Sequence, residues 1–317
     1  MESLFFPTFF SIFQALLKIF LIAGLAGILT YRKVISEEMI DGMSAMVAKI
    51  FLPMLTFATI VRSFDPGKQL YWWTLPLIAV GLIVIGLLFC MVLFSGSVRK
   101  KVNLLPLSSM QNAAYLILPI GEFAFKDQFE EFALICFLIN LGLNPFMWTV
   151  GKLMIVRDTS SRHLLWKILN PPFVANVISM GFVLTGTHRY IPDFVVESSQ
   201  LLGSATVPVA TFILGATLAM SIRSIPSFLD TFRVTFVKFV FIPLVMISML
   251  YLLDWGEKFP LLSQVLVIQS SSAPATAFIL MIRTYGGDVK KAGGIIFVSY
   301  FICLIAIPFW LTIWNLR

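Results

Sequence analysis

The sequence predicts an all-α polytopic membrane protein with ten transmembrane helices, arranged as two inverted repeats of five helices. Hydrophobic residues make up 59% of the chain and charged residues 12%, and the mean hydropathy is +0.94, well above that of soluble proteins. Its apolar runs approach the length that crosses the hydrocarbon core of a bilayer. Short motifs of the first half also return in the second half, which indicates an internal repeat.

Ten apolar segments are candidate transmembrane spans. Their approximate boundaries are 8–30, 39–61, 70–95, 104–126, 131–155, 164–186, 193–221, 231–253, 259–283 and 292–315. The net charge of +7 comes from short basic clusters between these segments, a pattern typical of topology signals and not of a nucleic-acid surface. The three cysteines fall in separate spans, so we expect neither a disulfide framework nor a metal site, and no cofactor.

Two motifs of the first half return 155 residues later. Pro53–Phe57 returns as Pro208–Phe212 (from 53 to 208), and Pro119 returns as Pro274 (from 119 to 274). Both pairs lie inside apolar runs, where proline breaks or kinks a helix. Matching breaks in two halves of a membrane protein are typical of secondary transporters. A weaker pair, Asn144–Phe146 and Ile307–Phe309, follows at an interval of 163 residues.

The basic residues predict the orientation of the spans. Of the 23 Lys and Arg residues, 13 lie in the connections after spans one, three, five, seven and nine, against six in the other connections and the termini. Because cytoplasmic connections are enriched in Lys and Arg, we expect both termini on the external side of the plasma membrane. Five spans is an odd number, so the second half (158–317) crosses the membrane inverted relative to the first (1–157).

The interrupted fourth and ninth spans form the predicted binding site. A break frees backbone N–H and C=O groups that lipid cannot satisfy, at a cost of about a few kcal/mol each. Helix N-termini at a break favour a carboxylate, and freed carbonyls favour a cation. The alternative is that Pro119 and Pro274 only kink helices that are otherwise intact. The predicted substrate-binding residues are Gln111, Asn112, Tyr115, Pro119, Gln269, Ser270, Ser271, Ser272 and Pro274.

Charged residues inside spans are candidates for coupling or charge compensation. Glu122 follows Pro119 in an apolar stretch and is a candidate proton carrier; the alternative is that it reaches the outer interface or pairs with Lys126. Lys49 is placed to face a cavity and neutralise an anion, or to snorkel. Lys238 is expected to snorkel at the cytoplasmic end of span eight. The repeat markers on the scaffold side are Pro53, Thr56, Pro208 and Thr211, and we expect both threonine hydroxyls to bond to their own helices.

Several motifs carry a family resemblance. Gln111–Ile120 resembles the fourth span of the auxin efflux carrier family, with its asparagine and terminal proline. Ala273–Ala277, Tyr285–Asp288 and the last span with Pro308 resemble the carboxyl end of that family, and Asn170–Pro172 resembles the start of its sixth span. The likeness covers essentially the whole chain. In length the chain is more similar to the prokaryotic malonate-transporter-like members than to the long plant PIN carriers.

This resemblance implies a PIN-like elevator fold, related to that of the bile-acid symporters, in which spans four and nine cross where they unwind. It implies a scaffold of spans 1, 2, 6 and 7 and a moving transport domain of spans 3–5 and 8–10. It also implies organic anions as substrates and maps the family's crossover asparagine onto Asn112. The chain departs from the family in one place: Asn112–Ala114 reads Asn-Ala-Ala where members often have Asn-Thr-Gly.

The predicted function is therefore secondary transport of a small organic anion, a carboxylate, by a crossover-elevator movement. Coupling to Na⁺, coupling to H⁺ and uniport all stay open, and so does a sodium-coupled symporter of the bile-acid type. A homodimer through the scaffold is expected, in contact with membrane lipid. A membrane sensor on the same scaffold is the main alternative. An enzyme is not expected, because the spans contain no nucleophile and base arrangement, no paired acids and no metal motif.

Overall fold

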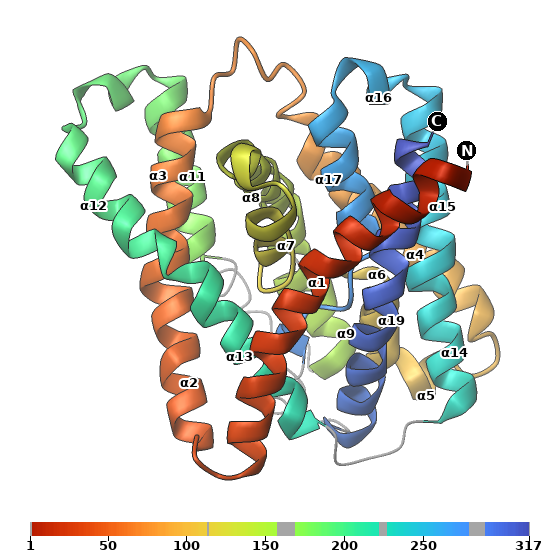
Figure 1. Ribbon diagram of the computed structural model, residues 1–317. Helices are drawn as coiled ribbons and strands as arrows, with labels where there is room; N and C mark the ends of the chain where they lie inside the picture. Colours follow the sequence, from red (N-terminus) through yellow and green to blue (C-terminus); the bar gives the residue numbers. More distant parts are fainter. Residues whose placement is uncertain (1, 113, 157–168, 222–226, 279–288, 317) are drawn as a thin grey trace.

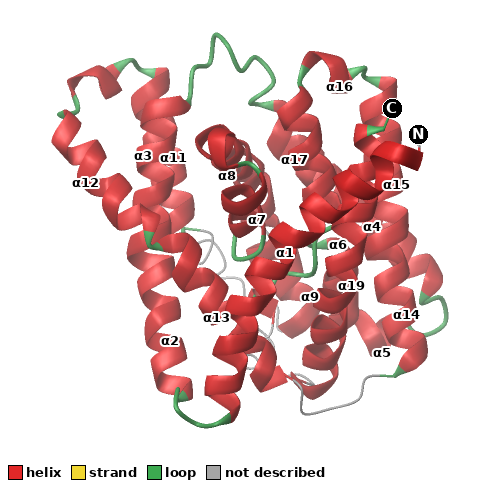
Figure 2. Cartoon of the chain, in the orientation of Figure 1, coloured by secondary structure: helices red, strands yellow, loops and turns green. Residues whose placement is uncertain are grey.

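The computed structural model describes residues 2–112, 114–156, 169–221, 227–278 and 289–316. In these ranges all regular structure is helical, and the sole β pairing is an isolated bridge (Figure 2). Both termini lie at the same end of the bundle, which we call the N/C end, and the turn between the first two helices lies at the opposite end (Figure 1). The predicted Tyr285–Asp288 motif lies outside the described residues.

Seven helical stretches of the described chain are long and apolar enough to cross a membrane, which confirms a polytopic membrane protein. They agree with seven of the predicted spans to within about five residues at each end. Their bounds are Phe5–Tyr31, Glu37–Ser63, Thr74–Leu93, Lys126–Met154, Asp193–Met220, Phe228–Leu252 and Ala292–Asn315.

The long helices build these stretches alone or in series. The single ones are α1 (Glu2–Tyr31), α4 (Thr74–Leu93) and α19 (Val289–Asn315). The series are α2 (Glu37–Met46), η1 (Val47–Phe51) and α3 (Leu52–Ser63); η3 (Lys126–Gln128), α8 (Phe129–Phe146), η4 (Met147–Gly151) and α9 (Lys152–Val156); α12 (Asp193–Ser204) and α13 (Thr206–Ser221); and α14 (Phe228–Phe236), η7 (Val237–Phe241) and α15 (Ile242–Leu252).

The other three predicted spans contain shorter helices. The range 104–126 holds α6 (Leu105–Ser109) and α7 (Ile117–Ala124), the range 164–186 holds α11 (Pro171–Leu184), and the range 259–283 holds α17 (Pro260–Ser270). Small helical segments complete the described chain: α5 (Val98–Lys101), η2 (Val102–Leu104), η6 (Thr187–Tyr190) and α16 (Trp255–Lys258).

Helix starts follow local sequence signals. The Ser36 hydroxyl accepts a hydrogen bond from the Met39 N–H at 3.2 Å and so caps α2. The Asn170 side-chain oxygen accepts from the Phe173 N–H at 3.0 Å and caps α11, which begins with a proline. Proline suits that first position because its missing N–H would have had no helical partner.

Wide π-helical turns accompany prolines inside the long helices. The turn η7 comes just before Pro243, whose ring lacks the N–H that would bond the carbonyl of Phe239. That carbonyl instead accepts a hydrogen bond from the Trp310 indole N–H of α19 at 2.7 Å. A neighbouring helix thus satisfies the backbone group that the proline frees, as a membrane interior requires.

The helices pack in two groups. In the first group, α1 lies against α13, and α3 lies against α11 and α12; in the second, α4 lies against α6 and α8, and α17 lies against α15 and α19. Glycines allow the closest approaches, since a Cβ on Gly215 would meet the backbone of Ala23, and a Cβ on Gly142 the backbone of Pro76. The two groups meet along α1, α3 and α13.

Candidate functional site

The helical course is interrupted within both the fourth and the ninth predicted spans. The helix α6 ends at Ser109 and α7 begins at Ile117, while α17 ends at Ser270. We call residues 110–112 and 114–116, together with 271–276, the crossing segments. Each one leaves backbone polar groups without a helical partner in the interior of the bundle.

The two crossing segments pair with each other. An isolated antiparallel bridge joins Gln111 and Pro274, and the Asn112 N–H donates to the Ala273 carbonyl at 2.9 Å. The Gln269 side-chain amide also donates to the Asn112 carbonyl at 3.4 Å. The pairing supplies backbone partners that neither segment has within its own helix, so the two breaks support each other.

The first break does not fall at Pro119, where the sequence analysis placed it. Pro119 is the third residue of α7, and the break lies before that helix. A proline is tolerated in the first turn of a helix because N–H groups there have no intrahelical acceptor. Pro274, in contrast, lies in its break. The interval of 155 residues therefore matches the two prolines in sequence, but not in their structural roles.

The side chain of Asn112 makes hydrogen bonds inside the protein through both its nitrogen and its oxygen. Its amide donates to the Tyr300 hydroxyl at 2.6 Å, and its carbonyl oxygen accepts from the N–H groups of Ala114 at 3.2 Å and Leu116 at 3.3 Å. The Tyr300 hydroxyl in turn donates to the Pro274 carbonyl at 3.3 Å. Asn112 and Tyr300 therefore tie both crossing segments to α19. Sequence reasoning did not identify Tyr300, because it is one aromatic residue in an apolar span.

The three serines that follow Gln269 satisfy the end of α17. The hydroxyls of Ser270 and Ser271 donate to the Val267 carbonyl at 2.8 Å, and the Ser272 hydroxyl donates to the Gln269 carbonyl at 2.9 Å. All three side chains are buried, and none lines a cavity described below. Their hydroxyl hydrogens thus serve the last carbonyls of the helix, which need partners at a break.

A cavity of about 490 Å³ adjoins the crossing segments, and we call it the amide hollow. It lies between the two helix groups, with walls from α2, α3, α11 and α13 on one side and from the crossing segments, α8 and η4 on the other. Asp41 is the only charged residue in its described wall. Six amide side chains line it: Gln111, Asn112, Asn140, Asn144, Asn170 and Asn176. Apolar and aromatic side chains fill most of the rest, among them Met110, Tyr115, Phe137, Met147 and Trp148.

Two buried polar atoms of this wall make no hydrogen bond within the described chain. They are the amide nitrogen of Gln111, a donor, and the side-chain oxygen of Asn176, an acceptor. The Asn176 amide nitrogen is engaged with the Phe137 carbonyl at 2.6 Å. Buried polar atoms normally have partners, so these two atoms are candidates for hydrogen bonds to a solute or to water. Asn140 and Asn176 could have been suspected from sequence, since polar residues are costly within apolar spans.

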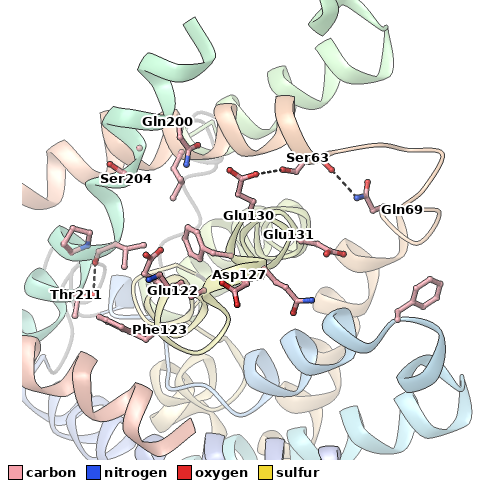
Figure 3. Close-up of a pocket in the computed structure, with 18 of the residues that line it drawn as sticks. Ser63, Gln69, Glu122, Phe123, Asp127, Glu130, Glu131, Gln200, Ser204 and Thr211 are labelled. Carbon is pink, nitrogen blue, oxygen red and sulfur yellow. Dashed lines mark hydrogen bonds between the residues drawn. The ribbon is translucent and has the colours of Figure 1, made fainter. Parts of the chain in front are cut away.

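A second cavity, of about 1240 Å³, opens at the N/C end, and we call it the acidic hollow (Figure 3). Four carboxylates and two lysines line it: Glu122, Asp127, Glu130, Glu131, Lys68 and Lys126. Glu122 is half-buried and forms no ion pair with Lys126. The Ser63 hydroxyl donates to Glu130 at 3.5 Å. Tyr71, in the connection between α3 and α4, also lines the wall; burial and the nearby Glu131 raise the pKa of its phenol to about 12.

The position of Lys49 fits its snorkelling alternative, whereas the position of Lys238 differs from the expectation. Lys49 is exposed, on the same outward side of its helix as Met46 and Ile50, and lines neither hollow. Lys238 does not snorkel, because its side chain is 0% exposed. The π-helical turn η7 and the helices around it enclose it completely.

The repeat markers lie beside the hollows. Thr56 lines the amide hollow, and Pro208 and Thr211 line the acidic hollow, while Pro53 is buried at the start of α3. The hydroxyls of Thr56 and Thr211 donate to the carbonyls of Leu52 and Val207 at 2.8 and 2.7 Å, so the two threonines do bond to their own helices.

Comparison with known proteins agrees with this architecture. A protein family described as membrane transport protein matches residues 11–165 and 155–311. An uncharacterized transporter of Methanocaldococcus jannaschii is 23% identical over 282 residues, which cover 87% of this chain and 90% of that protein. The protein PIN-LIKES 7 of Arabidopsis thaliana is 26% identical over 179 residues, which cover 51% of this chain and 45% of that protein.

Proposed function

Because this chain belongs to the membrane transport protein family, that of the auxin efflux carriers, and is a transporter and not an enzyme, we propose that it is a secondary transporter of a small organic anion. The observation that carries the proposal is the pairing of two interrupted helices at the wall of the amide hollow. Interrupted helices bring backbone dipoles and polar side chains to mid-membrane, where a solute can use them.

The chemistry of the amide hollow supports a carboxylate with an organic body. Its volume of about 490 Å³ lies within the usual range of small-molecule sites. The free amide donor of Gln111 suits a carboxylate oxygen, and the apolar wall suits the rest of the molecule. Amide donors bind an anion without placing a second full charge in the low-dielectric interior, which would be costly.

We further propose ten membrane passes in two inverted repeats, residues 1–157 and 158–317. The first helix group is the scaffold, formed by spans 1, 2, 6 and 7, and the second group, from spans 3–5 and 8–10, is the transport domain. Both hollows lie between these groups, one toward each end of the bundle. Sliding of the transport domain along the scaffold, an elevator movement, would then expose the crossing segments to each end in turn.

The N/C end is external in this proposal, with the protein in the plasma membrane. The amide hollow, which reaches the start of α2, then opens toward the cytoplasm, so the structure is an inward-facing state. The scaffold surface is the proposed contact of a homodimer within the lipid. Sodium and protons are both candidate coupling ions, and no cofactor is required.

Counterflow in liposomes tests this function. Purified protein is reconstituted with a high internal concentration of unlabelled acetate, malonate, benzoate or indole-3-acetate, and uptake of the same radiolabelled compound is followed against protein-free liposomes. A transporter exchanges at least one carboxylate of this panel, and excess unlabelled compound outside abolishes the signal. A sensor on the same scaffold would give binding without exchange, and lack of exchange with the whole panel would refute the proposal.

A further inference from the structure

Lys238 is the least expected charged residue of the structure. It lies in η7, in the middle of the α14–α15 stretch, and its side chain is among the largest that are fully buried. Its ammonium nitrogen makes no hydrogen bond and no ion pair within the described residues. An unpaired ammonium in a low-dielectric interior costs several kcal/mol, so a structural role alone would not favour lysine over methionine here.

In the described segments that pack against η7, the one carboxylate is already paired with another lysine. Five segments pack against η7, namely α4, α6, α14, α15 and α19. Together they contain one acidic residue, Asp230, which is buried two turns earlier and paired with Lys101 at 2.5 Å. Their other titratable residues are Cys90, Arg233, Tyr251, Lys290, Lys291, Tyr300 and Cys303. The counter-charge for an ammonium at this position must therefore come from outside these segments.

Lys238 is linked to the crossing segments through α19. The turn η7 packs against α19, and the Trp310 indole of α19 donates to the Phe239 carbonyl of η7 at 2.7 Å. The Lys238 amine lies within electrostatic range of the buried Cys303 thiol of α19. Tyr300, one helical turn earlier on α19, contacts Asn112 and Pro274. A negative charge held at the crossing segments would thus act on Lys238 through a region from which water is largely excluded, where electrostatic interactions are strong.

We propose that Lys238 is the proton-binding site that couples transport to the proton gradient. The side chain is a neutral amine in the empty transporter, and it takes up one proton when a carboxylate occupies the crossing segments. This inference rests on the proposed function, since an organic anion supplies the missing negative charge. Each ligand then favours the binding of the other, as thermodynamic linkage requires.

The proton balance of the cycle is simple. As the anion binds from the side where the amide hollow is open, a proton from the water on that side adds to the lone pair of the Lys238 amine, which itself lines neither hollow. Anion and proton cross together, which lowers the net charge that moves through the membrane. After the anion leaves on the other side, the unpaired ammonium loses its proton to water and the empty carrier returns. No oxidant, reductant or further ion takes part.

The test compares accumulation with exchange. Liposomes carry wild type or Lys238→Met, with equal potassium and valinomycin on both sides to hold the membrane potential at zero. Radiolabelled malonate and indole-3-acetate are the probes, each corrected with protein-free liposomes. With the outside more acidic than the inside, one coupled proton gives the wild type roughly tenfold accumulation for each pH unit.

Lys238→Met is expected to keep counterflow, with a half-saturating concentration about tenfold higher, but to lose accumulation driven by the pH gradient. Its thermal stability should equal or exceed that of the wild type, because methionine replaces an unpaired polar group with apolar volume. Lys238→Arg should also lose accumulation, since a guanidinium does not release its proton. The matched control is Lys18→Met, an exposed lysine of α1, which should accumulate like the wild type.

Other results would overturn either the proposed function or the role of Lys238. If the wild type exchanges neither these probes nor the rest of the carboxylate panel, the proposed function fails, and this inference fails with it. If the wild type exchanges but ignores the pH gradient, only the inference fails. Accumulation by Lys238→Met at the wild-type level would also overturn it, as would an unfolded Lys238→Met protein. Loss of the gradient response in Glu122→Gln alone would move the proton site to the acidic hollow.

Discussion

The two hollows differ in the kind of polarity that lines them. The amide hollow has six amide side chains and one carboxylate in its described wall, whereas the acidic hollow has four carboxylates and two lysines. Full charges lie where the cavity is wide and open to the N/C end, so that water can solvate them. Next to the crossing segments, neutral amides provide donors and acceptors without the desolvation cost of a charge. The first hollow is therefore suited to recognising a solute, and the second to attracting or repelling one.

The largest effect on transport is expected from a substitution that removes hydrogen bonds within the crossing segments. Asn112→Ala removes the oxygen that accepts two backbone N–H groups and the amide that contacts Tyr300. Each buried group left unpaired costs about 1–3 kcal/mol, so we expect counterflow to fall by about 100-fold while the protein still inserts. Counterflow and size-exclusion chromatography check this. The matched control is Asn315→Ala, at an exposed position, and normal exchange by Asn112→Ala would refute the site.

A sharper test removes one free donor from the amide hollow. Gln111→Leu deletes the unpaired amide nitrogen and keeps most of the volume. If that nitrogen binds the carboxylate, the half-saturating concentration in counterflow should rise by about tenfold, while thermal stability stays equal or increases because no internal hydrogen bond of that nitrogen is lost. Gln264→Leu, at a side chain that instead bonds to Asn315, should leave the affinity unchanged. If Gln111→Leu leaves the half-saturating substrate concentration unchanged, the Gln111 amide nitrogen does not bind the substrate and bonds only to water.

The carboxylates of the acidic hollow should influence transport by repelling external anions electrostatically. The double variant Glu130→Gln with Glu131→Gln reduces the negative charge at the N/C end, so external anions should enter more easily. We expect the half-saturating concentration for external substrate to fall by about two- to threefold at low ionic strength, and the effect to fade at about 1 M salt, where charges are screened within about 3 Å. Initial uptake rates in both salts check this. A change that survives high salt would indicate direct contact with the solute.

The smallest expected effect concerns Tyr71. Its pKa is raised from 10.0 to about 12, so the folded protein favours the neutral phenol. That contribution to stability is fully present below pH 10 and is lost as the pH rises toward 12. The melting temperature of the wild type should therefore fall slightly more steeply than that of Tyr71→Phe between about pH 9 and about pH 11. If the melting temperatures of the two proteins fall in parallel with pH, the phenol has the same pKa in the folded and unfolded states.

Residues of the candidate site differ in how far sequence could identify them. Asn112 stands out because a polar residue inside an apolar span is costly, and Pro274 because proline lacks the N–H that continues a helix. Tyr300 and Asn176 act through partners more than 30 residues away in the chain or on other helices, as in the Asn112–Tyr300 and Asn176–Phe137 hydrogen bonds. No local pattern reports such contacts. Pro119 was misjudged for a related reason: proline fits a first helical turn as well as a break, and only the backbone distinguishes the two.

The amino-acid sequence by itself determined that this chain is a helical membrane protein and where its long spans lie, and it predicted that two of its apolar segments are interrupted. Those properties depend on hydropathy and on helix breakers, which are local. Only the tertiary structure decided which side of each helix faces the interior. Lys49 and Lys238 are both lysines within apolar spans, yet one is exposed and the other fully enclosed. The reason is physical: burial depends on which neighbouring helices pack against a residue, and packing is set by the whole bundle.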